Sequence, residues 1–164
     1  MYIVDYDSFE FNGITISDGP GLALLDTGNT LISIPTRYKD AILKSLKQNK
    51  GLKCTPITEA NENYSQVQCE GTAEHMPDFG VTLQGIHFKV LGKDIIDQCT
   101  SLFGLFFRKC MINIEFENDG YQIILGKLFV SALSYSVFRK GVYDEYVYYV
   151  LFGQGRDLGD PAES

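Results

Sequence analysis

The chain has 164 residues, of which 45% are hydrophobic, so it is long enough for one domain with a substantial buried core. Its formal net charge of -7 at pH 7 argues against nucleic acid or an anionic membrane as a partner. No apolar run reaches the ~18 residues that a membrane-spanning helix needs, so we expect no membrane span.

The cysteines bear on the compartment in which the protein works. Cys54, Cys69, Cys99 and Cys110 occur without a C-x-x-C pair, and neither histidine has a ligand partner at metal spacing. We therefore expect no metal site, and two disulfides are the better interpretation. Disulfides indicate an oxidising compartment, yet residues 1–5 lack the basic and apolar segments of a signal peptide. A chain that has lost its own N-terminal part would explain both observations.

The first elements are predicted to be strands joined by tight turns. Residues 9–11 and 14–16 flank Asn12-Gly13, which is typical of a hairpin. An apolar strand then runs into Asp26, and a second apolar strand follows over residues 31–34. The turn between them places a carboxylate at the tip of a bend, where a charge is costly without hydrogen bonds or a partner group.

The turn itself reads Asp26-Thr27-Gly28-Asn29. An aspartate at the end of a strand often only hydrogen-bonds its own turn. An isolated Asp-Thr-Gly triplet also recurs by chance. Support for a chemical role must therefore come from the segments around it.

The hydrophobic period changes to that of a helix after residue 35. The apolar residues at helical spacing are Tyr38, Ala41, Ile42 and Leu46. Thr36 is expected to cap the start of this helix, and Gly51 is expected to end it. Residues 52–75 are polar and irregular, and we predict no regular element there.

The second half of the chain continues with strands. Residues 79–83 and 86–90 alternate on either side of Gln84-Gly85, which indicates a second hairpin. Residues 112–116 alternate between apolar and polar side chains, as expected of a half-buried strand with one wet face. A turn over residues 118–120 then leads back into the next strand.

Three predictions cover the end of the chain. Residues 121–126 form a strand, and a short helical turn follows over residues 127–131. A tyrosine-rich hairpin is expected over residues 135–152. The tail over residues 153–164 is polar, and we expect it to be loosely ordered.

The order of these features resembles the C-terminal lobe of a pepsin-like aspartic protease over residues 2–152. The segments that carry the resemblance are Leu24-Leu25-Asp26-Thr27-Gly28 after a hairpin, Ile34-Pro35-Thr36 before a helix, Met76-Pro77-Asp78-Phe79 before a strand, Asp97-Gln98-Cys99-Thr100-Ser101, and Ile124-Leu125-Gly126 with Phe129 and Ser136-Val137-Phe138. The resemblance implies a mainly β fold, with closed, orthogonally packed sheets and one or two short helices. Residues 1–152 would form this lobe.

In that family each of two lobes lends one catalytic carboxylate, and the pair activates a water molecule. The resemblance implies that Asp26 is this lobe's catalytic carboxylate. The active-site loop would be completed by Thr27, Gly28 and Asn29, and Thr30 would contact substrate. The segment Ile124, Leu125 and Gly126 would support the loop from below. No cofactor is implied.

The resemblance also implies a disulfide between Cys69 and Cys99, which leaves Cys54 to pair with Cys110. Three residues depart from the family pattern. Asn29 stands where a hydroxyl usually donates to the catalytic carboxylate, although an Asn amide can also donate. Lys127 and Arg139 stand where acidic residues are usual, so two local charges are reversed.

The triplet Asp-Thr-Gly occurs once, and no segment resembles the other lobe. We therefore expect half of an aspartic endopeptidase that hydrolyses peptides or unfolded proteins, inactive when isolated. The second carboxylate would come from the N-terminal lobe of a longer parent chain or from a second copy of this chain. The alternative is an inactive lobe, or a truncated product, that binds peptides or proteins. The resemblance and the cysteines together imply a secreted, lysosomal or vacuolar protein.

Overall fold

The computed structural model describes residues 2–58, 64–71, 75–102, 107–117, 122–133, 135–140 and 148–153. In chain order the strands are β1 (Tyr2–Phe11), β2 (Ile14–Thr15), β3 (Gly21–Asp26), β4 (Ile32–Pro35), β5 (Lys53–Thr58), β6 (Tyr64–Gly71), β7 (Phe79–Leu83), β8 (Ile86–Val90), β9 (Ile96–Leu102), β10 (Phe107–Glu117), β11 (Ile123–Gly126), β12 (Tyr135–Lys140) and β13 (Tyr148–Gly153). The helices are the 3-10 helix η1 (Thr36–Tyr38), α1 (Lys39–Gln48), α2 (Gly92–Ile95) and α3 (Lys127–Ala132).

The prediction of a mainly β fold with few short helices is confirmed. One sheet has the order β5-β6-β10-β4-β11-β3-β1-β7-β8, with β2 also paired to β1 and β9 to β10. Strands β12 and β13 pair with each other in a separate two-stranded sheet, at the position of the predicted last hairpin. Of the predicted tail, only Gly153 lies among the described residues.

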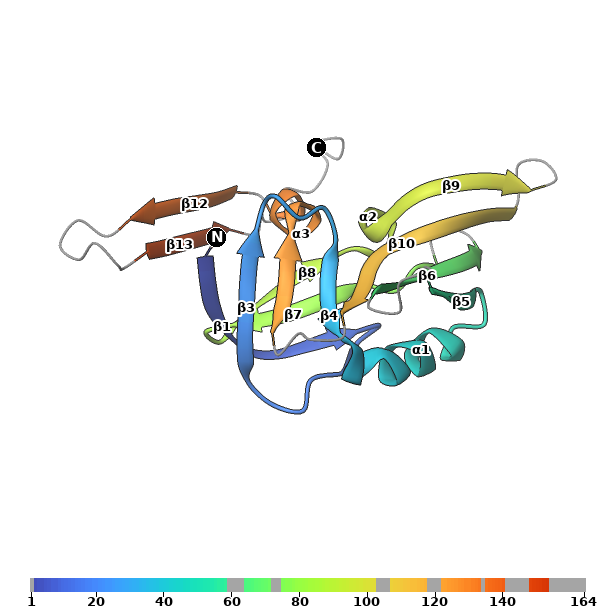
Figure 1. Cartoon of the computed structure of the whole chain (residues 1–164), viewed down its shortest axis with the longest axis horizontal. Coiled ribbons are helices and arrows are strands. Elements are labelled where there is room, and N and C mark those ends of the chain that lie inside the picture. Colours follow the sequence, from blue (N-terminus) through green and yellow to red (C-terminus); the bar gives the residue numbers. More distant parts are fainter. Residues whose placement is uncertain are drawn as a thin grey trace, which may run out of the picture.

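Strand β1 connects two groups of strands because it changes partner along its length. Its first half, from Tyr2 to Tyr6, pairs with β3, and its second half, from Tyr6 to Phe11, pairs with β7. The register shifts between Tyr6 and Ser8, and such an irregularity bends a strand. In Figure 1, β3 and β4 stand upright while β7 and β8 run across behind them, so the two groups of strands cross.

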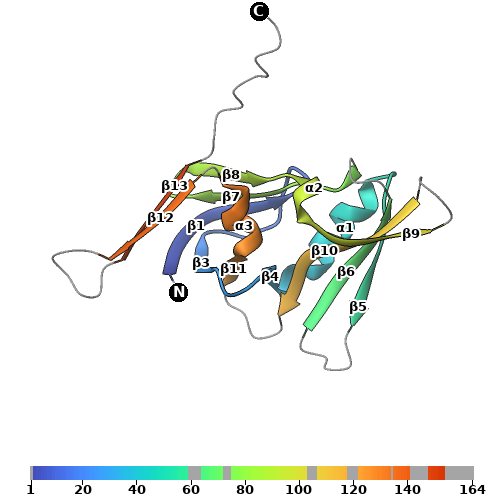
Figure 2. The ribbon, with the colours of Figure 1, turned by 90° about the horizontal axis from the view of Figure 1, so that it is seen from above.

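The core lies where these crossed strands and the helices meet. Phe9 of β1 packs edge to face on Tyr38 at the end of η1, with the ring centroids 5.1 Å apart. Phe88 of β8 contacts Phe129 of α3. Figure 2 shows α3 next to β11. All four side chains are buried. Burial of these rings therefore holds α3, which directly follows β11, in place.

Both short hairpins form where the sequence predicted them. Asn12 and Gly13 have φ values of 56° and 70°, and Gln84 and Gly85 have φ values of 50° and 77°. Two successive residues with positive φ are the geometry of a type I′ turn, whose twist matches that of the strands on either side. These turns join β1 to β2 and β7 to β8.

The helix after β4 forms, but its predicted ends are wrong. Thr36 does not cap it, because Thr36 is itself the first residue of η1 and Pro35 precedes it without a side-chain cap. The helix ends at Gln48, before Gly51, because the Asn49 side chain accepts from the Gly51 amide at 3.1 Å and donates to the His75 carbonyl. The apolar face is buried except for Ala41, which is exposed.

The prediction that residues 52–75 are irregular is wrong. Strands β5 and β6 form an antiparallel pair there, and β6 also pairs with β10. Val67 and Cys69 of β6 are buried, and Gln68 between them is polar. Because polar residues flank these two positions in β6, the strand signal in this segment was weak.

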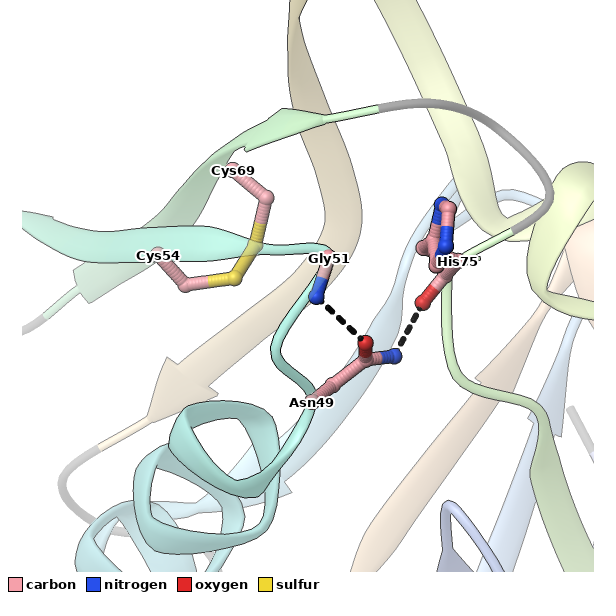
Figure 3. The surroundings of a disulfide bond; sticks show 5 residues. All are labelled: Asn49, Gly51, Cys54, Cys69 and His75. Atoms are coloured by element: carbon pink, nitrogen blue, oxygen red, sulfur yellow. Dashed lines mark hydrogen bonds between the residues drawn. A yellow bond between two sulfur atoms is a disulfide. The ribbon is translucent and has the colours of Figure 1, made fainter.

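The predicted disulfides Cys69–Cys99 and Cys54–Cys110 are also wrong. The structure has a disulfide between Cys54 and Cys69, drawn in Figure 3, whose Cα atoms are 4.0 Å apart. The cause is the register of the β5–β6 pair, which places these two residues directly opposite each other. Register also places the backbone of Cys110 opposite Cys69 on one side and opposite Cys99 on the other.

Loss of the Cys54–Cys69 disulfide is expected to destabilise the lobe by about 3 kcal/mol, the chain-entropy value for a loop of this size. The two residues are 15 positions apart. The measurement is urea unfolding of C54S/C69S against the unchanged protein. Peptide mapping without reduction is the control, and a peptide linking Cys69 to Cys99 would contradict the structure.

A polar network joins the loop before β3 to the end of η1. The Tyr38 hydroxyl donates to Asp18 Oδ1, and Arg37 Nη2 donates to the Tyr38 hydroxyl at 3.0 Å. The hydrogen bond from Tyr38 lowers the pKa of Asp18 below its ordinary value. Burial, with Tyr38 nearby, raises the pKa of Tyr6 to about 12.

Substitution Tyr38→Phe is expected to raise the pKa of Asp18 towards its ordinary value. Because folding lowers this pKa, the network stabilises the fold above the unfolded-state pKa, and that contribution is lost as pH falls through the folded-state pKa. Y38F should therefore flatten the acid end of the stability curve. Carboxyl-carbon NMR titration of Asp18 checks the shift, with D18N as the control that removes the titration. An Asp18 pKa that does not change in Y38F would contradict this interpretation.

Candidate active site

The Asp-Thr-Gly loop lies between the end of β3 and the start of β4. Asp26 is the last residue of β3 and is half-buried, while Thr27 and Gly28 are exposed. The Gly28 amide donates to Asp26 Oδ1 at 2.9 Å, and the Asn29 amide donates to the Asp26 carbonyl at 3.1 Å. A Cβ on Gly28 would lie 3.1 Å from Asp26 Oδ1, so glycine lets the backbone approach the carboxylate closely. The turn thus fixes one oxygen of an accessible carboxylate.

Strand β11 runs beside this loop within the same sheet. It pairs with β3 in parallel, so that Gly126 lies opposite Asp26, and it pairs with β4 on its other edge. The Asn29 carbonyl accepts from the Lys127 amide at 2.6 Å, where β11 passes into α3. The segment Ile124, Leu125 and Gly126 therefore contacts both strands of the loop from between them.

Asn29 is held by hydrogen bonds on every side. Its Oδ1 accepts from the Leu31 amide at 2.9 Å. Its Nδ2 donates to Ser33 Oγ at 3.0 Å and lies 3.5 Å from Glu115 Oε1. An Asn amide carries two hydrogens, and these two acceptors account for both. In this structure the side-chain amide of Asn29 therefore faces Ser33 of β4 and Glu115 of β10.

Ser33 and Glu115 are residues of the site that the sequence analysis missed. Ser33, in β4, donates its hydroxyl hydrogen to Glu115 Oε1, and the two residues are register partners in the parallel pair of β4 and β10. The alternation in β10 assigned Glu115 to a wet face, but the side chain is half-buried. Only the long-range pairing of β4 with β10 brings Glu115 to the loop, and the sequence has no local signal for that pairing.

Comparison with known families identifies the lobe. A family model described as eukaryotic aspartyl protease matches residues 1–144. The chain belongs to this family. Among individual curated proteins, none matches the chain. Membership of the aspartyl protease family confirms the resemblance drawn from the sequence and supports a peptidase-like chemistry, for which peptides are the substrates.

A cavity opens beside the loop of this aspartyl protease lobe. Its volume is about 570 Å³, and its lining residues are Thr30, Asp94, Lys127, Leu128, Ser131 and Ala132. Thr30 therefore lies at the border between the Asp-Thr-Gly loop and a space large enough for a side chain of a ligand. The lining includes the basic residue Lys127 and the acidic residue Asp94, so the cavity offers charged groups of both signs to a ligand. The side chain of Arg139 lies outside the described residues.

Two observations concern metal ions and membrane spans. Among the described residues, no group of three or more His, Cys, Asp or Glu side chains could hold a metal ion. In the same part of the chain, no helix is long and apolar enough to cross a membrane. Asp26 contributes a carboxyl group to the loop, and a carboxyl group is one of the side chains that can serve as a general acid or base.

Proposed function

We propose that this chain supplies one of the two catalytic carboxylates of an aspartic endopeptidase, and that Asp26 carries it. The observation that supports this proposal best is the geometry of the loop. Asp26 lies accessible at the end of β3, with one oxygen fixed by the Gly28 amide at 2.9 Å and with β11 beside it. Catalysis requires that the reacting group be held in a fixed position, and these contacts hold the Asp26 carboxylate in this way.

The proposed reaction uses a water molecule and a second carboxylate. Two carboxylates about 3 Å apart cannot both ionise, so they share one proton and titrate as a coupled pair. The ionised member takes a proton from the water as it attacks the peptide carbonyl, while the protonated member donates to the carbonyl oxygen. In this scheme Thr27, which is exposed at the tip of the loop, hydrogen-bonds to the partner loop.

The partner that lends the second carboxylate is the N-terminal lobe of a longer parent chain, or a second copy of this chain. Thr30, beside the cavity of about 570 Å³, would contact the substrate backbone. The substrate would be a peptide or an unfolded protein. Family membership and the disulfide support a compartment outside the cell or within a lysosome or vacuole.

The test uses the protein as its own cells make it, purified through a tag on this chain. We expect this preparation to cleave an unfolded protein at acid pH, where a carboxylate pair that shares a proton is in its working state. The 164-residue chain produced alone is expected to be inactive if the second carboxylate comes from a parent chain, and active as a dimer if it comes from a second copy. Cleavage should persist in the presence of a chelator. If the preparation cleaves nothing at any pH, or loses its activity to the chelator, the proposal is wrong.

A second candidate is a binding lobe without catalysis. Two observations favour it: the Asn29 amide points to Ser33 and Glu115, and the cation Lys127 lines the cavity beside the loop. This candidate predicts that the tagged preparation binds extended peptides and releases them intact. Mass spectrometry of the peptides after incubation separates the two functions.

A further inference from the structure

Glu115 reaches the Asp-Thr-Gly loop from a distant part of the chain. It lies on β10, and its Oε1 atom accepts from Ser33 Oγ and lies 3.5 Å from Asn29 Nδ2. Ser33 is only 1% exposed, so water cannot easily replace the carboxylate as the acceptor for its hydroxyl. One carboxyl oxygen of Glu115 therefore lies within reach of two hydrogen-bond donors, the Ser33 hydroxyl and the Asn29 side-chain amide.

Asn29 transmits this contact to both sides of the loop. Its backbone amide donates to the Asp26 carbonyl at 3.1 Å, and its backbone carbonyl accepts from the Lys127 amide at 2.6 Å. Its side-chain Oδ1 accepts from the Leu31 amide at 2.9 Å. A shift of Asn29 would therefore disturb the turn that carries Asp26 and the junction of β11 with α3 at the same time.

We propose that Glu115 is a positioning residue, which holds Asn29 through Ser33 and so fixes the Asp26 turn against β11. For the effect on catalysis this inference rests on the proposed endopeptidase function. The part of the inference that concerns the geometry of the loop does not depend on that function. Glu115 carries a carboxyl group, and hydrogen bonds to a carboxylate that is ionised are roughly twice as strong as neutral ones. We therefore expect the charge of the ionised carboxylate, as well as its oxygen acceptor, to help hold Asn29 in place.

The variants separate these contributions. E115Q keeps an oxygen acceptor without the charge, and E115A removes the acceptor and leaves the buried Ser33 hydroxyl without it. Glu117 offers a matched control, because it lies two residues further along β10, on the same face of the strand, and is also half-buried. In register it lies opposite Pro35, beyond the loop. E117A should therefore leave the loop unchanged.

Hydrogen exchange tests the geometry without any need for activity. The amides of Leu31 and Lys127 both donate to Asn29, so their exchange rates report how firmly Asn29 is held. We expect both to exchange about tenfold faster in E115A than in the unchanged protein, with E115Q between them and E117A unchanged. Unchanged rates in E115A, or equal acceleration in E117A, would overturn the inference. If E115A does not fold, rates in E115Q equal to those of the unchanged protein would overturn it.

Kinetics of the tagged preparation test the effect on catalysis. We expect kcat to fall about 100-fold in E115A with a smaller change in KM, because a misplaced carboxylate slows the chemical step more than it weakens binding. E115Q should recover part of the lost kcat. If the unchanged protein is active and E115A keeps its kcat, the positioning role is wrong. If the unchanged protein is inactive, the proposed function fails, and the exchange rates alone decide the inference.

Discussion

Asp26→Asn is expected to abolish peptide-bond cleavage and leave the fold intact. The substituted side chain has the same shape, and its oxygen can still accept from the Gly28 amide that now lies 2.9 Å from Asp26 Oδ1. An amide cannot share a proton with a second carboxylate or take one from water. Loss of this acid–base role should lower kcat/KM by about 10⁴-fold. The measurement is kcat/KM of the tagged preparation on one peptide substrate, with near-ultraviolet circular dichroism to check the fold.

A matched substitution shows whether the effect is specific. Asp40 lies exposed in the first turn of α1, so D40N makes the same chemical change away from the loop. We expect D40N to keep full activity. If D26N also keeps its activity, Asp26 is not a catalytic carboxylate, and the binding lobe becomes the better account of this chain. If both variants lose activity, the assay reports a loss of folded protein, and the same circular dichroism spectra will show it.

The sequence predicted those parts of the fold that depend on neighbouring residues. The Asn12-Gly13 turn specifies a hairpin because residues in that pair adopt positive φ, and the structure has this geometry. The burial of Tyr38, Ile42 and Leu46 follows from helical spacing in the same way. Family membership, which the order of such local signals implied, is confirmed by the match over residues 1–144.

The predictions that failed depend on which strands pair across long stretches of chain. Cys54 meets Cys69 because β5 and β6 are adjacent in a particular register, which the polar sequence of this segment conceals. Glu115 meets Ser33 because β10 pairs with β4 in parallel, although 82 positions separate the two residues. Register decides such contacts, and a shift of one residue reverses the face of every side chain. Local patterns identify a strand, therefore, but do not identify its partner.

Gly126→Ala is expected to be the most destabilising small substitution at the loop. Gly126 lies opposite Asp26 in the sheet, and a Cβ there would come within 2.2 Å of the Leu31 carbonyl oxygen and 2.6 Å of the Asn29 carbonyl oxygen. Both obstacles are backbone atoms, which cannot rotate away as a side chain does. The backbone of Gly126 itself, at φ -79° and ψ -168°, is allowed for alanine, so the cost is purely steric.

To admit this methyl group, β11 must move away from the loop, which breaks the 2.6 Å hydrogen bond between the Lys127 amide and the Asn29 carbonyl. We expect a loss of about 3 kcal/mol, seen as a fall in Tm of roughly 10 °C. Gly28→Ala is the informative comparison, because its Cβ would approach only the Asp26 carboxylate, at 3.1 Å. G28A should therefore impair cleavage with little change in Tm. Equal Tm values for G126A and the unchanged protein would show that β11 does not hold the loop, because a strand free to shift would admit the methyl group at little cost.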